Sequence, residues 1–231
     1  AAGIDSILVG DSASNVMAGN QDTTPITVDQ MIYHARAVVR ACHHCLVVCD
    51  MPFGSYQVSR EDGIRNAIRI IKETGAGAVK MEGGKEIADT VKGIVDAGIP
   101  VIGHLGLTPQ SIHKFGGYGL RAKEDTEAEK LIEDALALDA AGVSGITLEK
   151  VPAALANKVT AMVKAATIGI GAGNGTDGQV LVYADALGMT SGFKPKFLRH
   201  FANVNKCMTE GVMEYIRCVK SESFPSEAES Y

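Results

Sequence analysis

The sequence predicts an α/β fold of the (β/α)8 barrel class, the TIM barrel, from two observations. Short apolar runs alternate with amphipathic helical patterns, so strand and helix follow each other repeatedly along the chain. A glycine also stands six to eight residues before the polar residue that closes an apolar run, at Gly3, Gly75, Gly98 and Gly142. Because a glycine just past a helix adopts the left-handed cap conformation, each one marks the passage from a helix into a buried parallel strand.

Seven candidate strands follow from these runs. They are SILVGD, CLVVCD, AVKME, PVIGH, GITLE, TIGIG and QVLVYADA, beginning at residues 6, 45, 78, 100, 145, 167 and 179. Repeated βα units indicate a parallel sheet, and an eighth strand would close it into a barrel. The chain opens on Ala1 without a methionine, so we expect the first strand to be missing from the N-terminus of this chain. We therefore predict a single (β/α)8 barrel domain over residues 1–231.

The helices between these strands have recognisable ends. Thr27 and Gln30 form a capping-box pattern ahead of an apolar helical face. Ser59 is a cap for the next helix, which we expect to stop at Gly75. Pro152 occupies the first position of a later helix.

The C-terminal segment after residue 196 carries further helical patterns, and we expect its helices to pack outside the barrel or on a neighbouring subunit. Its apolar residues are Phe197, Phe201, Val204, Met208, Val212 and Ile216.

Composition and charge exclude several classes of function. The 231 residues are 46% hydrophobic and 21% charged, with a net charge of −5. An acidic chain without a basic cluster lacks the field that attracts nucleic acid. No apolar stretch approaches the roughly 20 residues that span a bilayer, and the first residues lack the charged and apolar regions of a signal peptide. We expect a cytoplasmic protein without nucleic-acid or membrane partners.

Two local motifs suggest other functions but fit them poorly. Cys42, His43, His44 and Cys45 approach a zinc motif, yet ligands at neighbouring positions give poor tetrahedral geometry, and we interpret all five cysteines as reduced thiols. The string GIGAGNG at 169–175 resembles a dinucleotide-binding loop. It lacks a convincing acidic residue about 20 positions on and precedes no clear helix.

Polar residues close the apolar strands, and these are the candidate functional residues. They are Asp11 with Ser12, Asp50, Lys80, Glu82, His104 and Glu149. In a barrel the carboxyl ends of the strands form the catalytic rim, so these side chains should meet. Carboxylates gathered there repel each other unless a cation neutralises them, and oxygen ligands favour Mg²⁺. Lys80 and Glu82 lie two apart on one strand and project to the same face, where a lysine can hold a substrate carboxylate.

Each of these residues also has a structural interpretation. Asp11 and Asp50 are each explained as helix caps, which often follow a strand. His104 is explained as a hydrogen-bonded structural histidine, and Glu149 as one half of a surface pair with Lys150. Their shared position at the ends of strands favours the catalytic interpretation of the whole set.

Seven strings then give the chain a family resemblance. In order they are ILVGDS, DMPFGSY, VKMEGG, GHLGLTPQS, FGGY, LEKVP and IGIGAGNGTDGQVLV, and GHLGLTPQS (103–111) is the most specific. The chain resembles the ketopantoate hydroxymethyltransferase family over nearly its whole length. The resemblance implies a (β/α)8 barrel that uses Mg²⁺ to transfer a hydroxymethyl group from 5,10-methylenetetrahydrofolate to 3-methyl-2-oxobutanoate. The product is 2-dehydropantoate, in pantothenate synthesis.

The resemblance also implies roles for individual residues. Asp11 and Asp50 match the metal-binding aspartates, and Glu82 matches the acidic residue that completes the surroundings of the ion, directly or through water. Glu149 in LEKVP matches the catalytic base. The residues that match the substrate-binding positions are Asp11, Ser12, Asp50, Lys80 and His104. The family commonly forms a homodecamer, which the resemblance extends to this chain.

The match has departures, and two rivals remain. After GDS the chain reads ASNVMAGNQ, where many members have LG and a histidine near Gln21, and Lys150 stands where others have cysteine. A carbon–carbon lyase or phosphonate mutase of the same barrel type typically carries the loop string KKCGH, which is absent. The second rival is a catalytically idle barrel retained for assembly or binding, and the intact polar residues at the strand ends argue against it.

Overall fold

The computed structural model describes residues 2–190, 192 and 194–231. The chain falls into two compact units, Ala1–Gln179 and Val180–Tyr231. The single barrel domain over residues 1–231 stays a prediction.

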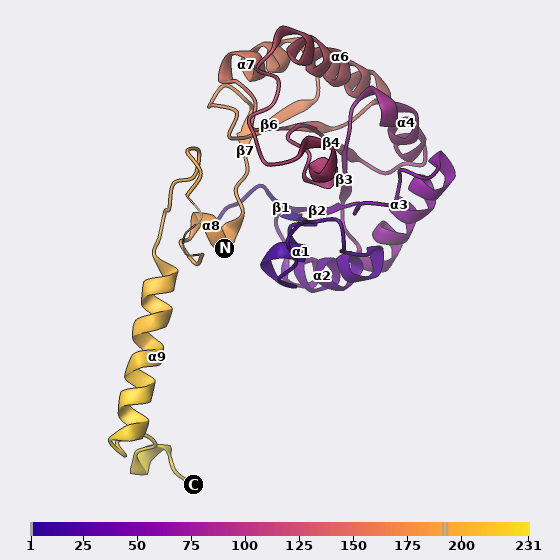
Figure 1. The fold of residues 1–231 in the computed structure, drawn as a ribbon. Helices are drawn as coiled ribbons and strands as arrows, with labels where there is room; N and C mark the ends of the chain where they lie inside the picture. Colours follow the sequence, from indigo (N-terminus) through magenta and orange to yellow (C-terminus); the bar gives the residue numbers. More distant parts are fainter. Residues whose placement is uncertain (1, 191, 193) are drawn as a thin grey trace. The chain divides into compact units, whose positions relative to one another are not determined.

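The first unit contains a parallel sheet of seven strands in the order of the sequence. The strands are β1 (Ser6–Val9), β2 (Leu46–Asp50), β3 (Ala78–Glu82), β4 (Val101–Gly106), β5 (Gly145–Glu149), β6 (Ala166–Ile170) and β7 (Gly178–Gln179). Figure 1 shows the sheet curled, with helices around its outside. Among the described residues β1 and β7 do not pair, so the curl is open there. The predicted α/β class is confirmed, whereas the missing first strand stays a prediction.

Five long helices lie against the outer face of the sheet, each in contact with the next (Figure 1). They are α2 (Val28–Ala41), α3 (Arg60–Thr74), α4 (Ala88–Asp96), α6 (Asp125–Ala141) and α7 (Ala153–Met162). Four short helices, α1 (Ala13–Val16), η1 (Lys85–Ile87), η2 (Pro109–Ser111) and α5 (Ile112–Phe115), follow β1, β3 and β4 at the carboxyl end of the sheet.

Two predicted helix starts and one predicted helix end are observed, and a third start is shifted by one position. Thr27 Oγ1 accepts a hydrogen bond from Gln30 N at 3.2 Å, and Gln30 Oε1 accepts one from Thr27 N at 2.9 Å. Ser59 accepts from the third residue of α3, which ends at Gly75 in the left-handed conformation with φ of 78°. Pro152 is the N-cap of α7, one position before the expected place.

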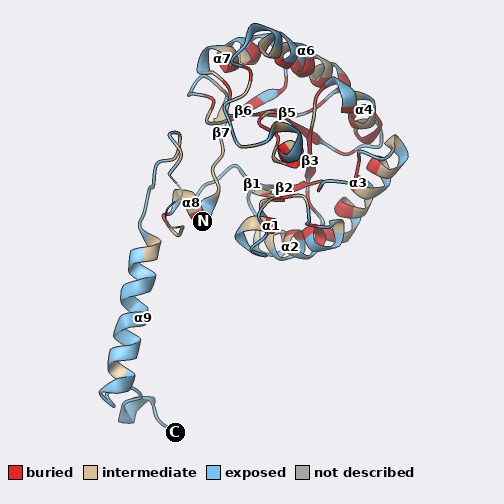
Figure 2. Cartoon of the chain, viewed as in Figure 1, coloured by how far each residue is buried: buried red, intermediate tan, exposed pale blue. Residues whose placement is uncertain are grey.

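The alternation of side chains gives the sheet two different faces. Val48, Ala78 and Ile102 form a small apolar cluster without any helix residue, so they lie inside the curl. Their strand neighbours Val47 and Val79 belong to the large core beneath the helices. Figure 2 shows buried residues on the strands and on the inward sides of the helices. Because the helices and their apolar core cover the outer face, the inner face is the one left for a polar site.

The last predicted strand is wrong over most of its length. Of residues 179–186 only Gln179 lies in β7, and Tyr183–Ala186 form the helix α8. Strand β7 pairs with β6 alone among the described residues, so the backbone beyond it finds no ladder partners. The alanines of this stretch favour a helical turn, in which Leu187 N donates to Tyr183 O at 2.9 Å.

The second unit consists of α8, the helix α9 (Val204–Lys220) and the short helix η3 (Glu227–Glu229). Phe201 N donates to Ala186 O at 2.7 Å, which joins the segment before α9 to the end of α8. The packing of the C-terminal helices outside the barrel stays a prediction. In the part of the chain that the structure describes, no helix has the length and apolarity to cross a membrane.

Candidate active site

The polar residues at the strand ends lie on the inner face of the curled sheet. Asp50 stands two residues after Val48 of the inner apolar cluster, so its side chain points to the same side. Strand register then aligns the neighbours, because Asp50 pairs with Lys80 and Glu82 pairs with His104. All four polar side chains are at least 94% buried. The alternation of side chains along each strand predicts this cluster, and the strand register brings its members side by side.

Lys80 and His104 link the carboxylates of neighbouring strands. Lys80 Nζ lies 2.8 Å from Asp50 Oδ1 and 3.9 Å from Glu82 Oε1. His104 Nδ1 lies 3.3 Å from Glu82 Oε1, and its Nε2 lies 3.3 Å from Glu149 Oε2. The structure thus brings together five of the predicted residues, from strands β2 to β5.

The charged neighbours of His104 determine whether its ring is protonated. Burial lowers the pKa of His104, as does Lys80, whose Nζ lies 3.2 Å from Nδ1. The contacts with Glu149 and Glu82 outweigh both effects and raise the pKa of His104 to about 9. The histidine is therefore a cation at neutral pH, held between two carboxylates.

Asp11 completes the cluster at the end of β1. Its backbone N donates to Asp50 Oδ2 at 2.9 Å, and the residue is 4% exposed. Burial and the negative charges of Asp50 and Glu82 raise the pKa of Asp11 to about 8, although Lys80 and a hydrogen bond from Gln110 oppose the shift. Asp50 and Glu82 thus disfavour a further negative charge at Asp11, whose acid form predominates at neutral pH.

Asp11 and Asp50 are the candidate ligands of a magnesium ion. Among the described residues, one oxygen of Asp11 accepts no hydrogen bond, whereas Asp50 Oδ2 accepts from Asp11 N and Asp50 Oδ1 lies 2.8 Å from Lys80 Nζ. Mg²⁺ is usually held by one or two carboxylates together with waters and substrate oxygens, which this pair allows. Among the described residues, no three His, Cys, Asp or Glu side chains form a complete metal cage.

Glu82 is placed differently from the two aspartates. Its Oε2 accepts from Gln110 N at 2.9 Å, and its Oε1 faces His104 and Lys80. Burial alone would raise the pKa of Glu82, but His104 and Lys80 lower it below the usual range. Both oxygens of Glu82 thus have protein partners.

Ser12 and Glu149 lie at the edge of the cluster. A Cβ at Gly10 would stand 3.0 Å from Ser12 Oγ and 3.5 Å from Asp50 Oδ2, so the glycine leaves both groups room. The side chain of Glu149 is 17% exposed, and its one polar contact among the described residues is with His104. Glu149 is therefore the carboxylate of the set best placed to meet a bound molecule.

The structural interpretations of Asp11, Asp50 and Glu149 are not supported by their contacts. Ser12 is the residue at the N-cap of α1, and Asp11 makes its side-chain contact with Gln110. Asp50 lies within β2 and caps no helix. Glu149 makes no ion pair with Lys150, whose Nζ donates to the carbonyl oxygen of residue 118.

Gln110 and Tyr56 are site residues that sequence reasoning missed. Gln110 Nε2 donates to Asp11 Oδ2 at 2.8 Å and to Met51 O at 2.9 Å, while its Oε1 accepts from Tyr56 Oη at 2.6 Å. Tyr56 Oη also accepts from Glu82 N at 3.0 Å. Both residues lie in strings that carry the family resemblance, DMPFGSY and GHLGLTPQS, which is the signal that could have pointed to them.

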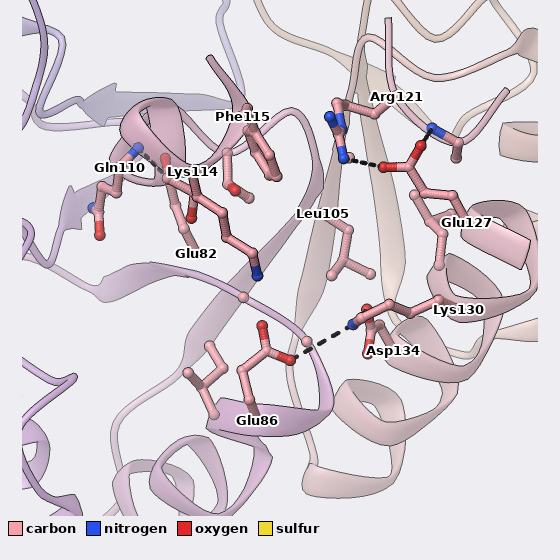
Figure 3. Close-up of a pocket in the computed structure, with 18 of the residues that line it drawn as sticks. Glu82, Glu86, Leu105, Gln110, Lys114, Phe115, Arg121, Glu127, Lys130 and Asp134 are labelled. Carbon is pink, nitrogen blue, oxygen red and sulfur yellow. Dashed lines mark hydrogen bonds and ion pairs between the residues drawn. The ribbon is translucent and has the colours of Figure 1, made fainter. Parts of the chain in front are cut away.

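A cavity of about 630 Å³ borders the cluster at Glu82 and Gln110. Figure 3 shows these two residues on one side of it, and on the other side charged residues of the segment that leads into α6 and of α6 itself. Arg121 pairs there with Glu127, and Lys130 with residues of η1 and α6. The cations that line this side are thus already neutralised by neighbouring carboxylates.

The segment that departs from the family strings has its own local contacts. Ser14 Oγ donates to Asp22 O at 2.7 Å and accepts from Asn20 Nδ2 at 3.1 Å, which closes the turn after α1. Lys150 adopts a positive φ of 47°, and its N donates to Ile170 O at 2.9 Å. Both departures flank the cluster without replacing any of its members.

The sequence model of ketopantoate hydroxymethyltransferase matches residues 1–227. The chain belongs to the ketopantoate hydroxymethyltransferase family. Relatives named 3-methyl-2-oxobutanoate hydroxymethyltransferase include that of Flavobacterium johnsoniae, 60% identical over 230 residues that cover 100% of this chain and 85% of the relative. The proteins of Bacteroides fragilis (84% covered) and Cytophaga hutchinsonii (85% covered) are 59% and 58% identical, again over 100% of this chain. The predictions of the family and of a transferase enzyme are confirmed.

Solved structures of other proteins share the fold of this family member. One from Burkholderia cenocepacia, described as a phosphonomutase, has a TM-score of 0.57 at 17% identity and covers 73% of this chain and 70% of its own. A second from the same species, described as a lyase or mutase, has a TM-score of 0.55 at 15% identity, with 97% and 77% covered. At these identities the likeness concerns the fold alone, so the lyase and mutase activities do not extend to this chain.

Proposed function

We propose that the chain transfers a hydroxymethyl group from 5,10-methylenetetrahydrofolate to 3-methyl-2-oxobutanoate, forming 2-dehydropantoate for pantothenate synthesis. Family membership and the name of the relatives support the acceptor and the transferred group. The folate donor follows from the resemblance of the motifs. In the balanced reaction, carbon 3 of the oxoacid loses a proton and forms the new carbon–carbon bond, water supplies the hydroxyl oxygen, and tetrahydrofolate leaves.

The observation that carries this proposal is the division of the carboxylates within one cluster. Asp11 keeps one oxygen that accepts no hydrogen bond among the described residues, and the adjacent Asp50 Oδ1 faces the cation Lys80, whereas the oxygens of Glu82 face a backbone donor, His104 and Lys80. Glu149 stands apart with a single polar contact and a partly exposed side chain. Enolisation of an oxoacid requires this division, because positive charge must meet the developing oxyanion while a separate base takes the proton.

The residues on the inner face would hold the oxoacid as follows. Lys80 and the protonated His104 supply positive charge for its carboxylate and keto oxygen, and Ser12 supplies a hydroxyl donor. Asp11 and Asp50, with Glu82 acting through water, would hold Mg²⁺. When bound, the ion stabilises negative charge on the oxygens of the enolate.

Glu149 is the proposed base at carbon 3. A carboxylate that is hydrogen-bonded from several donors holds a proton weakly, which describes Glu82. Glu149 has a single polar contact among the described residues and a partly exposed side chain, so it is the carboxylate placed to approach a bound oxoacid. His104, 3.3 Å away, keeps the carboxylate oriented toward the cluster. We also propose a cytoplasmic homodecamer, which rests on the family resemblance.

Replacing Asp50 by asparagine tests the metal site. The variant removes one of the two proposed ligand charges while keeping the shape of the side chain, so Mg²⁺ binding in calorimetry and Mg²⁺-dependent turnover should both be lost. Asp125→Asn, at the exposed start of α6, is the control and should bind Mg²⁺ like the unaltered chain. Unchanged Mg²⁺ affinity in Asp50→Asn would remove the metal assignment.

Replacing Glu149 by glutamine tests the base. With 3-methyl-2-oxobutanoate and Mg²⁺ in deuterated water but no folate, the unaltered chain should exchange the proton at carbon 3, followed by proton NMR. Glu149→Gln should slow this exchange by at least about 100-fold, the usual contribution of a general base. Glu133→Gln on the exposed side of α6 is the control. Exchange at the original rate in Glu149→Gln would assign the base elsewhere.

A further inference from the structure

The CHHC string that fits zinc poorly has a second possible chemistry. Cys42 is the C-cap of α2, and Cys45 directly precedes β2, so the string forms the turn between the helix and the strand. The turn brings the two sulfur atoms to 3.1 Å from each other, closer than two sulfur atoms in ordinary van der Waals contact. A small movement of the side chains would reach the roughly 2.05 Å of a disulfide bond.

Solvent reaches this pair of thiols. Cys42 and Cys45 are both half-buried, and His43 and His44 between them are exposed. Leu46 after the pair is 44% exposed as well. A dissolved thiol or disulfide can therefore approach the turn without unfolding α2 or β2.

The other three cysteines do not share these properties. Cys49 is fully buried, and burial raises the pKa of its thiol, so it is a poor nucleophile. Cys207 and Cys218 both lie on α9, eleven positions and so about 16 Å apart along the helix. Such a separation exceeds the reach of a disulfide within one helix.

We propose that Cys42 and Cys45 form a redox-active dithiol that exchanges with low-molecular-weight disulfides and closes into an intramolecular disulfide. In the first step a thiolate of the pair attacks one sulfur of the small disulfide, which forms a mixed disulfide and releases one small thiolate. The second cysteine then attacks the mixed disulfide and releases the other small thiolate. The two protons of the pair pass to the released thiolates, and the two electrons reduce the small disulfide.

The contact between the sulfurs is symmetric, because either one can be the donor of the hydrogen bond. Either cysteine can therefore attack first while the other closes the ring. The site lies at the amino end of β2, with Cys45 about 16 Å along the strand from Asp50, so the carboxylate cluster is not part of it.

Mass spectrometry after incubation with glutathione disulfide tests the proposal. The whole chain is oxidised, its remaining thiols are alkylated under denaturing conditions, and the fragment 41–60 released by trypsin is analysed. We expect this fragment to lose two hydrogens, with fragmentation that assigns the bond to Cys42 and Cys45 and the alkyl group to Cys49. Dithiothreitol should restore three alkylated cysteines.

Two variants separate this dithiol from general thiol oxidation. Cys45→Ser should accumulate one glutathione on Cys42 and form no disulfide within the fragment, whereas Cys49→Ala should form the disulfide like the unaltered chain. Equal circular dichroism of the reduced proteins verifies that each variant folds. Alkylation of Cys42 and Cys45 to the same extent as Cys49 after oxidation would overturn the proposal, as would a disulfide that joins Cys49 to either of them.

Discussion

Replacing Gln110 by leucine should lower the free energy of unfolding, because it removes hydrogen bonds at the carboxylate cluster. The amide donates to Asp11 Oδ2 at 2.8 Å and to Met51 O at 2.9 Å, and all three residues are buried. Leucine has a similar size but no donor, so two buried acceptors lose a partner. Tyr56 keeps a partner, because its hydroxyl lies 3.0 Å from Glu82 O.

The magnitude follows from these two losses. A hydrogen bond between neutral groups contributes about 0.5–1.5 kcal/mol, and an unpaired buried carbonyl oxygen costs about 1–3 kcal/mol. We expect the free energy of unfolding of Gln110→Leu to fall by about 3 kcal/mol. Since the Gln110 hydrogen bond lowers the pKa of Asp11, its loss also favours the protonated acid. Mg²⁺ should then bind more weakly to the variant.

Urea unfolding at pH 7, followed by circular dichroism, measures this change with the slope of the transition as a test of two-state behaviour. Gln57→Leu is the matched control, because Gln57 is exposed and donates to the acceptor side of the same amide at 3.2 Å, while its own Oε1 accepts from Gly54 N and Tyr56 N. Its free energy of unfolding should fall by less than about 1 kcal/mol. A loss in Gln110→Leu no greater than that of the control would refute the role of Gln110 in positioning Asp11.

Two further predictions concern the middle of the sheet. The pKa of His104 is raised from 6.5 to about 9 on folding, so its protonation stabilises the fold fully below pH 6.5, and the contribution is lost as pH rises through about 9. The shift corresponds to at most about 3 kcal/mol, so His104→Gln should lose more stability at pH 6 than at pH 9.5 in urea unfolding, and equal losses would contradict a protonated ring. Gly106 has a φ of 88°, and a Cβ there would lie 2.3 Å from Glu149 O, so Gly106→Ala should lower the free energy of unfolding by more than about 2 kcal/mol. Gly119→Ala, with nothing within 4 Å, is the control, and a similar loss in both would show that the contact with β5 is unimportant.

Local patterns in the sequence were sufficient for most of the fold. The capping box at Thr27, the cap at Ser59 and the left-handed glycine at Gly75 are short-range features, and each appears as predicted. The strand that failed is the one at the open edge, where only β6 supports β7. Its residues from Tyr183 on form a helix, because strand pairing depends on a neighbour that an apolar run does not reveal.

For the candidate site, too, local patterns predicted one part and the tertiary structure decided the rest. Alternation along single strands predicted that Lys80 and Glu82 share a face, and that the residues closing the strands meet, but not which side chains touch. The roles of these residues stay proposals that the contacts support.

By itself, the sequence determined the family, the parallel βα order and the polar residues at the strand ends, because periodicity, caps and motif strings are all local. Only the tertiary structure decided which of these polar side chains contact each other. Gln110 reaches Asp11 across 99 positions of the chain, and His104 stands between two glutamates from different strands. The curl of the sheet creates these contacts, since it brings the carboxyl ends of separate strands around one buried space where few charges are solvated.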